Sequence, residues 1–270
     1  MSTRDLFESP FNEPLGLFSS PLPTPESFGD ARCRRFEFAS RGDRVPGRLL
    51  LPDRGEGPFP LILLQHGLGE CKESPRLDAA SDWVREGAAV ASIDLPLHGE
   101  RASAKLSQRL LDSVEQGLSG SQLDSPSTLL WVEFARQAVI DSRRALDALA
   151  VFPDLDESQA VYAGFDLGAG LGAIFCAVDS RPKAAALALT GGGFGPSQVD
   201  PCAYIAKLAP RPVLLVNVEG DGRISRQATE ALFEAARDPK RIEWIDASQS
   251  DRTDAVLSTM WRFLRTQPGV

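Results

Sequence analysis

One short stretch of the chain has the spacing of a catalytic turn. Residues 160–172 read Ala-Val-Tyr-Ala-Gly-Phe-Asp-Leu-Gly-Ala-Gly-Leu-Gly, an apolar strand that passes through a glycine-flanked turn into a helix of small residues. The turn is Gly164-x-Asp166-x-Gly168, the spacing of a nucleophile elbow, in which a strained strand-to-helix corner lifts one side chain out of a sheet. Serine is the usual apex residue, whereas this chain has Asp166. Its chemistry therefore depends on what an aspartate can do there and on which groups assist it.

The elements around this turn are those of an α/β fold. Short continuous apolar runs predict strands buried on both faces, and amphipathic segments between them predict helices. Their alternation implies right-handed crossovers and a mostly parallel central sheet of about eight strands, with helices on both faces. Besides the strand that enters the elbow, the predicted strands are 34–39, 45–51, 59–64, 88–93, 184–190, 212–218 and 241–245, the first two as an antiparallel hairpin. The predicted helices are 76–86, 106–118, 125–149, 167–178, 226–236 and 254–265. Ser125-Pro126 predicts an N-cap followed by proline at the first helical position.

The length of 270 residues fits one α/β domain preceded by an arm. Residues 1–30 contain five prolines with apolar residues between them, which predicts an extended Pro-rich N-terminal arm, and residues 31–270 form the domain. The sequence leaves open whether the arm docks on its own domain, docks on a partner subunit of a homodimer, or is disordered. Within the domain, the polar segment 102–125 is expected to make an excursion over the sheet that roofs a pocket.

Composition excludes several classes of function. The formal net charge of -8 gives no basic patch for nucleic acid. The chain has neither an apolar run of about 18 residues nor the features of a signal peptide, so we expect a cytoplasmic protein with no membrane contact. The four cysteines lack the spacing of metal ligands, and we expect neither a metal nor a cofactor.

Four motifs occur in a fixed order along the chain. His66-Gly67 follows the strand at 59–64, Asp94-x-Pro96-x-His98-Gly99 follows the next strand, the elbow comes third, and Asp221 follows the strand at 212–218. In this order and spacing the chain resembles the α/β-hydrolase superfamily, and most of all its dienelactone-hydrolase and esterase-like branch. The resemblance implies an α/β-hydrolase fold for residue 31 onward. Only residues 191–211 separate two of the later strands, which leaves no room for a large cap domain.

The resemblance also implies roles for individual residues. The backbone amides of Leu68 and Leu167 take the oxyanion-hole positions, where they would stabilise an acyl-transfer intermediate whatever their side chains. Asp221 matches the acid of the catalytic triad. The triad histidine should follow the last strand, and Gln249 aligns with its position.

The chain has only two histidines, and none follows His98. The triad base is therefore missing together with the serine. We expect both histidines to hydrogen-bond loop backbone, with His98 the better catalytic candidate because it is the one expected to face the pocket. His66, Gly67 and Gly191 are expected to line the pocket, and Lys72, with the glutamates beside it, to lie at a solvated helix entrance.

The leading prediction is an α/β-hydrolase-fold protein without a working triad that retains a pocket for a small apolar or ester-like ligand. Loss of the serine or the histidine alone costs a serine hydrolase about a millionfold in rate. The alternative is an unconventional hydrolase or lyase for ester- or lactone-type substrates with Asp166 as nucleophile or base; an anion can attack unaided, but water activation then lacks a base. In a third possibility Asp166 and Asp221 are neighbouring carboxylates with Gln249 between them, either as an acid/base pair or bridged by the amide in a retired site.

Overall fold

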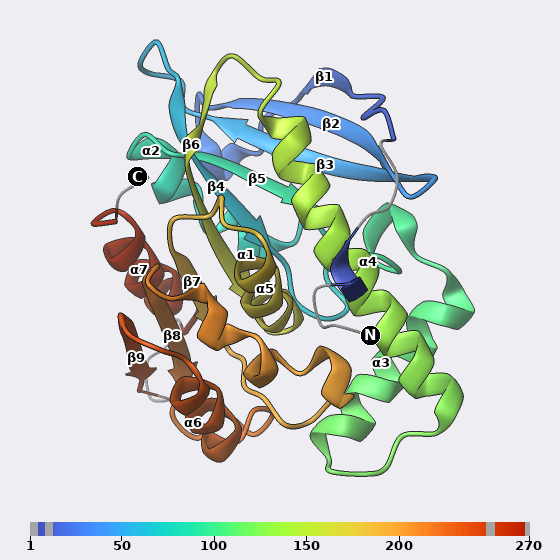
Figure 1. Ribbon diagram of the computed structural model, residues 1–270. Coiled ribbons are helices and arrows are strands. Elements are labelled where there is room, and N and C mark those ends of the chain that lie inside the picture. Colours follow the sequence, from blue (N-terminus) through green and yellow to red (C-terminus); the bar gives the residue numbers. More distant parts are fainter. Residues whose placement is uncertain (1–4, 9–12, 247–251, 268–270) are drawn as a thin grey trace.

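The computed structural model of the chain describes residues 5–8, 13–246 and 252–267 and has a nine-stranded sheet at its centre. The strand order is β1-β2-β3-β5-β4-β6-β7-β8-β9 (Figure 1). The pairs from β1 to β5 along this order are antiparallel, and all pairs from β5 to β9 are parallel. The strands are β1 (Phe18–Leu22), β2 (Arg32–Ser40), β3 (Asp43–Leu51), β4 (Phe59–Gln65), β5 (Ala89–Ile93), β6 (Leu155–Phe165), β7 (Ala185–Ala188), β8 (Val213–Val218) and β9 (Lys240–Ile245).

Helices cover both faces of the sheet (Figure 1). Alternate residues of β4 belong to two separate cores. Leu61 and Leu63 pack with the helices at 125–149 and 167–178, whereas Ile62 and Leu64 pack with those at 81–85 and 252–264. The predicted α/β-hydrolase fold is thus the observed architecture. Among the described residues, no helix combines the length and apolarity needed to cross a membrane. The helices are α1 (Pro75–Asp78), α2 (Ser81–Arg85), α3 (Ala104–Leu118), α4 (Ser125–Leu149), α5 (Leu167–Val178), α6 (Arg226–Ala235) and α7 (Arg252–Leu264).

The structure corrects two details at helix starts. The helix expected over 76–86 is two short helices, because the chain turns at Ala79 and Ala80 between α1 and α2. The N-cap of α4 is Asp124 rather than Ser125: its carboxylate accepts a hydrogen bond from the Ser127 amide at 2.7 Å. A carboxylate at this position also interacts favourably with the helix dipole, so Ser125 and Pro126 become the first helical residues.

The N-terminal arm packs on its own domain. Its residues 18–22 form β1, which pairs with β2 and raises the sheet from the expected eight strands to nine. Earlier in the arm, Phe7 is buried against the core, with its ring 5.5 Å from that of Tyr204. The guanidinium of Arg143 on α4 donates to the Phe7 carbonyl oxygen at 2.8 Å. The described part of the arm is therefore a structural part of the domain.

Phe7→Ala should destabilise the protein by about 3 kcal/mol, because it removes a ring that is buried in the core and leaves a cavity. Phe18→Ala is the matched control: Phe18 lies in the same arm but is 53% exposed, and its truncation should change the free energy of unfolding by less than about 0.5 kcal/mol. Urea unfolding followed by circular dichroism measures both. Equal losses from the two variants would contradict the docking of the arm through Phe7.

Candidate functional site

Asp166 occupies a strained corner between β6 and α5. Its backbone has φ 50° and ψ -115°, a conformation that costs a non-glycine residue roughly 1–3 kcal/mol. A Cβ at Gly164 would lie 2.8 Å from the carbonyl carbon of Gly168, and a Cβ at Gly168 would lie 2.5 Å from the carbonyl oxygen of His66. Only glycine allows these approaches, so the turn has the elbow geometry that its spacing predicts.

The carboxylate of Asp166 is held by two donors from other loops. Arg223 donates through Nη1 to Oδ2 at 2.7 Å, and the amide of Leu68 donates to the same oxygen at 3.3 Å. Arg223 also donates through Nη2 to Glu115 of α3 at 2.9 Å. Burial raises the pKa of Asp166, while the charge of Arg223 opposes that rise. The apex of the elbow thus carries a mostly buried carboxylate with its own counter-ion, and one expected oxyanion donor points at that carboxylate.

Arg223 is the site residue that the sequence analysis does not single out. It lies two residues after Asp221 in the loop between β8 and α6, and no motif connects an arginine there to the elbow. The usable signal is charge: a carboxylate at a buried turn requires a cation, and Arg223 is the only basic residue in the segment 213–225.

Asp221 supports the same loop instead of pairing with Asp166. Its Oδ1 accepts a hydrogen bond from the Arg223 amide at 2.9 Å. In the described part of the chain, the ionic partner of Asp166 is Arg223, not a second carboxylate. Gln249 lies outside the described residues, so the alignment of Gln249 with the triad histidine and of Asp221 with the triad acid stays a prediction.

Both histidines hydrogen-bond loop backbone. His66 accepts through Nε2 from the Leu95 amide at 3.1 Å, which assigns the ring proton to Nδ1, 2.8 Å from the Gly67 carbonyl oxygen. The Nδ1 of His98 lies 2.8 Å from the Pro96 carbonyl oxygen. Burial lowers the pKa of His66 to about 4 and also lowers that of His98. None of the described contacts of His98 reaches the elbow, and its catalytic role stays a prediction.

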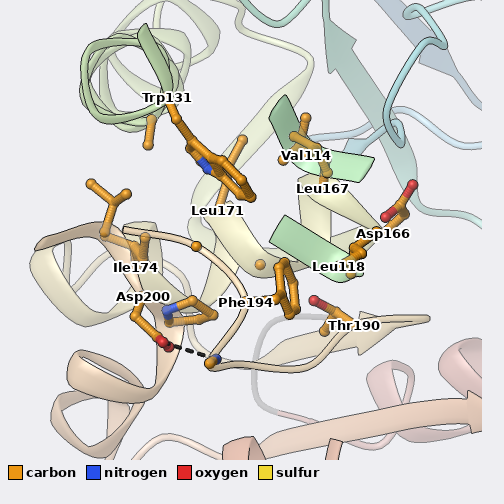
Figure 2. A pocket seen from close by; sticks show the side chains of 16 residues that line it. Val114, Leu118, Trp131, Asp166, Leu167, Leu171, Ile174, Thr190, Phe194 and Asp200 are labelled. Carbon is orange, nitrogen blue, oxygen red and sulfur yellow. Dashed lines mark hydrogen bonds between the residues drawn. The ribbon is translucent and has the colours of Figure 1, made fainter. Parts of the chain in front are cut away.

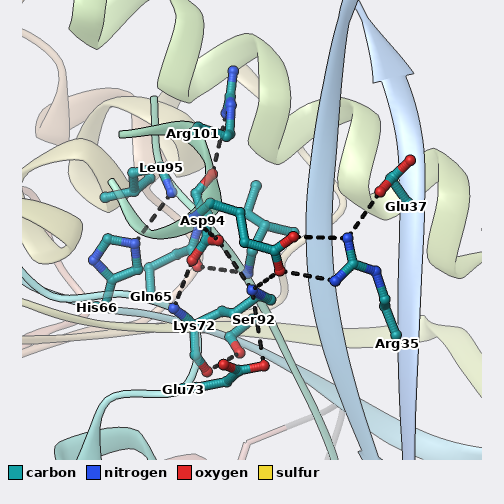
Figure 3. Close-up of polar contacts among 12 residues, drawn as sticks. Arg35, Glu37, Gln65, His66, Lys72, Glu73, Ser92, Asp94, Leu95 and Arg101 are labelled. Atoms are coloured by element: carbon teal, nitrogen blue, oxygen red, sulfur yellow. Dashed lines mark hydrogen bonds and ion pairs between the residues drawn. The ribbon is translucent and has the colours of Figure 1, made fainter. Parts of the chain in front are cut away.

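A buried charge network joins the loops that follow β4 and β5 (Figure 3). Lys72 is 2% exposed, and its Nζ lies 3.0 Å from Oδ2 of the fully buried Asp94 and 2.7 Å from Oε1 of Glu100. The Lys72 amide also donates to Asp94, at 2.9 Å, and Arg35 of β2 pairs with Glu100 at 2.8 Å. The expectation that Lys72 is solvated is therefore wrong, because its ammonium group forms an ion pair with the buried carboxylate of Asp94.

An apolar pocket opens beside Asp166 (Figure 2). About 40 Å³ of it is accessible to the centre of a water molecule, and the empty space up to and including its solvent-open mouth is about 520 Å³. Val114 and Leu118 of α3 contribute to the wall, so part of the segment 102–125 forms one side of a pocket, and Trp131 of α4 faces them (Figure 2). The other lining residues are Ala135, Leu167, Gly170, Leu171, Ile174, Thr190, Gly193, Phe194, Gly195, Val199, Asp200 and Pro201.

Three residues expected to line the pocket are not among its lining residues. His66 is fully buried beneath its loop, and the Gly67 amide donates to Glu70 at 2.9 Å. Gly191 packs so closely against α6 that a Cβ would lie 2.7 Å from the backbone of Ala228. The sequence located the loops correctly, but the cavity lies on the side of the elbow that faces α3 and α4.

Comparison with known proteins gives a consistent result. Residues 25–189 match the acetyl xylan esterase (AXE1) family. The fold is similar to that of an acetyl xylan esterase from Paenibacillus sp. R4, with a TM-score of 0.73, 17% identity, and coverage of 98% of this chain and 92% of that one. Acetyl xylan esterase 1 from a Thermoanaerobacterium species has a TM-score of 0.66 and 15% identity, with coverage of 98% of this chain and 92% of that one. A putative dienelactone hydrolase from Klebsiella pneumoniae has a TM-score of 0.63 and 16% identity, with coverage of 93% of this chain and 99% of that one. The resemblance to the α/β-hydrolase superfamily is confirmed.

Mild acid should destabilise the protein through His66. The pKa of His66 is about 4 in the folded chain against an ordinary 6.5, so as the pH falls the unfolded chain binds this proton first. Stability is therefore lost between these two pH values, by about 3 kcal/mol for this group. Urea unfolding at pH 7 and pH 4.5 should show a smaller acid loss for His66→Gln than for the wild type, and equal losses would contradict the assignment.

Lys72→Met should destabilise the protein by about 3–5 kcal/mol, because Asp94 then remains buried without a counter-charge. Lys105→Met, at an exposed position of α3, is the control and should cost less than about 0.5 kcal/mol. Thermal and urea unfolding of both variants check this. Similar small changes in both would show that the network contributes little.

Proposed function

The chain belongs to the acetyl xylan esterase family, and from this premise we propose that it binds a small, mainly apolar ligand beside Asp166 without ordinary serine-hydrolase turnover. The observation that carries the proposal is the state of the elbow apex. Where acyl transfer needs a hydroxyl, Asp166 has a carboxylate that is paired with Arg223 at 2.7 Å. A carboxylate whose charge is neutralised by an ion pair is a poor nucleophile, and the pair holds the elbow and the loop of Arg223 together.

The surroundings of the apex support the same proposal. Acyl transfer requires a base that takes the hydroxyl proton and later protonates the leaving group. The two histidines of the chain hydrogen-bond loop backbone, and burial lowers the pKa of each. The Leu68 amide donates to Asp166, so a developing oxyanion would have to compete with a resident carboxylate.

The pocket supports a ligand that is mostly apolar. Its wall consists largely of aliphatic and aromatic side chains from α3, α4 and α5, and few polar side chains interrupt it. A small site of this kind gains affinity from burying apolar surface, while a few polar groups orient the ligand. Asp166 is one of the few polar residues of the lining, and its carboxylate pairs with Arg223 of the neighbouring groove.

An ester panel tests the absence of turnover. Purified protein should hydrolyse p-nitrophenyl acetate, p-nitrophenyl butyrate and a simple lactone no faster than Asp166→Ala does. Turnover that disappears in Asp166→Ala would refute the proposal. A mass increase on the Asp166 peptide would instead support the alternative in which Asp166 is a nucleophile.

Restoring the missing groups provides the positive arm of this test. The double variant Asp166→Ser with Gln249→His should gain ester hydrolysis if the site differs from an active esterase in these groups alone.

Gly170→Leu tests the pocket, because Gly170 lines it and a larger side chain there would fill it. This variant should lose binding of an apolar probe such as 1-hexanol by isothermal titration calorimetry while it keeps the circular dichroism spectrum of the wild type.

A further inference from the structure

Two hollows meet at the ion pair of the elbow. The apolar pocket is lined by Asp166, and a more open groove beside it is lined by Arg223 and the neighbouring residues of the β8–α6 loop. Leu118, Gly193 and Phe194 line both. The contact of 2.7 Å between Asp166 and Arg223 therefore crosses the boundary between pocket and groove.

The guanidinium of Arg223 occupies a position between two carboxylates. Its Nη1 lies 2.7 Å from Oδ2 of Asp166, and its Nη2 lies 2.9 Å from Oε1 of Glu115. The elbow and α3 thus form two sides of a cation site that the protein fills with its own side chain. Without this side chain, Asp166 would retain the Leu68 amide as its described donor, and the two carboxylates would lack a shared counter-ion.

Arg223 is placed so that it can leave. Its side chain is 36% exposed, and Gly222 and Ser225 of the same loop are exposed, whereas Ile224 is buried and anchors the loop. The guanidinium is the partly exposed end of this pair, where water screens its interaction with the more buried Asp166, so the pair contributes about 1 kcal/mol. A ligand that supplies a cation of its own could therefore displace the guanidinium at small cost.

The acidic residues of the site favour a ligand with a positive charge. The ionisable lining residues are Asp166 and Asp200, and the lining includes neither lysine nor arginine. Asp200 is already engaged, since it accepts from the Gly193 amide at 2.8 Å and the Cys202 amide at 2.9 Å. An anionic head group near the mouth would face the carboxylates of Asp166 and Glu115 once Arg223 moved, whereas a cation would restore the charge balance.

We propose that this site takes an amphipathic amine: the apolar tail enters the pocket, and the ammonium group displaces Arg223 from Asp166 and Glu115. The inference rests on the proposed function, namely that the pocket binds a small, mainly apolar ligand. Arg223 then competes with the ammonium group for Asp166 and Glu115, and so lowers the affinity of the site for amines.

Three probes with the same tail test the proposal: hexylammonium chloride, 1-hexanol and sodium hexanoate, titrated calorimetrically at pH 7, where a primary amine is protonated. Hexylammonium should bind most tightly and hexanoate most weakly. Arg223→Ala should tighten hexylammonium binding about fivefold, the ratio that corresponds to an ion pair of about 1 kcal/mol, and should leave hexanol binding unchanged. Asp166→Asn should abolish the preference for the amine over the alcohol.

Arg226→Ala is the matched control, because Arg226 is three residues away, pairs with Glu230 at 2.8 Å and lines neither hollow. It should leave all three affinities unchanged. Three results would overturn the inference: equal binding of hexylammonium and hexanol by both the wild type and Arg223→Ala, tighter binding of hexanoate, or weaker amine binding by Arg223→Ala. In each of these cases, binding of hexanol would still support the proposed function. Failure of all three probes to bind would overturn both.

Discussion

The site depends on the close approach of the elbow to the loop that follows β4. A Cβ at Gly168 would lie 2.5 Å from the carbonyl oxygen of His66, so the two backbones are in contact without any intervening side chain. Parallel pairing of β4 with β6 aligns the ends of the two strands, and the glycines let the turn close over that edge. Asp166 is consequently brought to 3.3 Å from the Leu68 amide. The fold fixes the position of residue 166, and the chemistry of the site depends on the side chain at this position and on the groups that contact it.

The loops around the elbow are held by buried ionisable groups. His66 and His98 are buried and accept or donate to neighbouring backbone, and Lys72 with Asp94 fastens the loops after β4 and β5 from within. A buried pair of this kind contributes little net stability over apolar packing, but the loss of one partner is costly. The ionisable groups of these loops therefore serve the architecture. In the part of the chain that the structure describes, Asp166, Arg223 and Glu115 are the charged groups whose contacts connect the elbow with α3 and the β8–α6 loop.

The same scaffold occurs in esterases whose sequences share less than a fifth of their residues with this chain. Conservation of the fold at such low identity is expected, because the sheet and its two cores are stabilised by apolar burial that does not involve the site. In this chain the ion pair of Asp166 and Arg223 lies between the apolar pocket and the neighbouring groove.

The order of strands and helices, the elbow at Asp166 and the absence of a histidine after His98 could all be predicted from the sequence, because they follow from local periodicity, glycine spacing and simple counting. The ninth strand could not, since β1 contains a proline and forms only by pairing with β2. Tertiary structure alone decided that Lys72 is buried on Asp94, 22 residues away, and that Arg223 reaches Asp166 across 57 residues. Both contacts join separate loops at one edge of the sheet, and ion pairs of this kind leave no periodic signal in the chain.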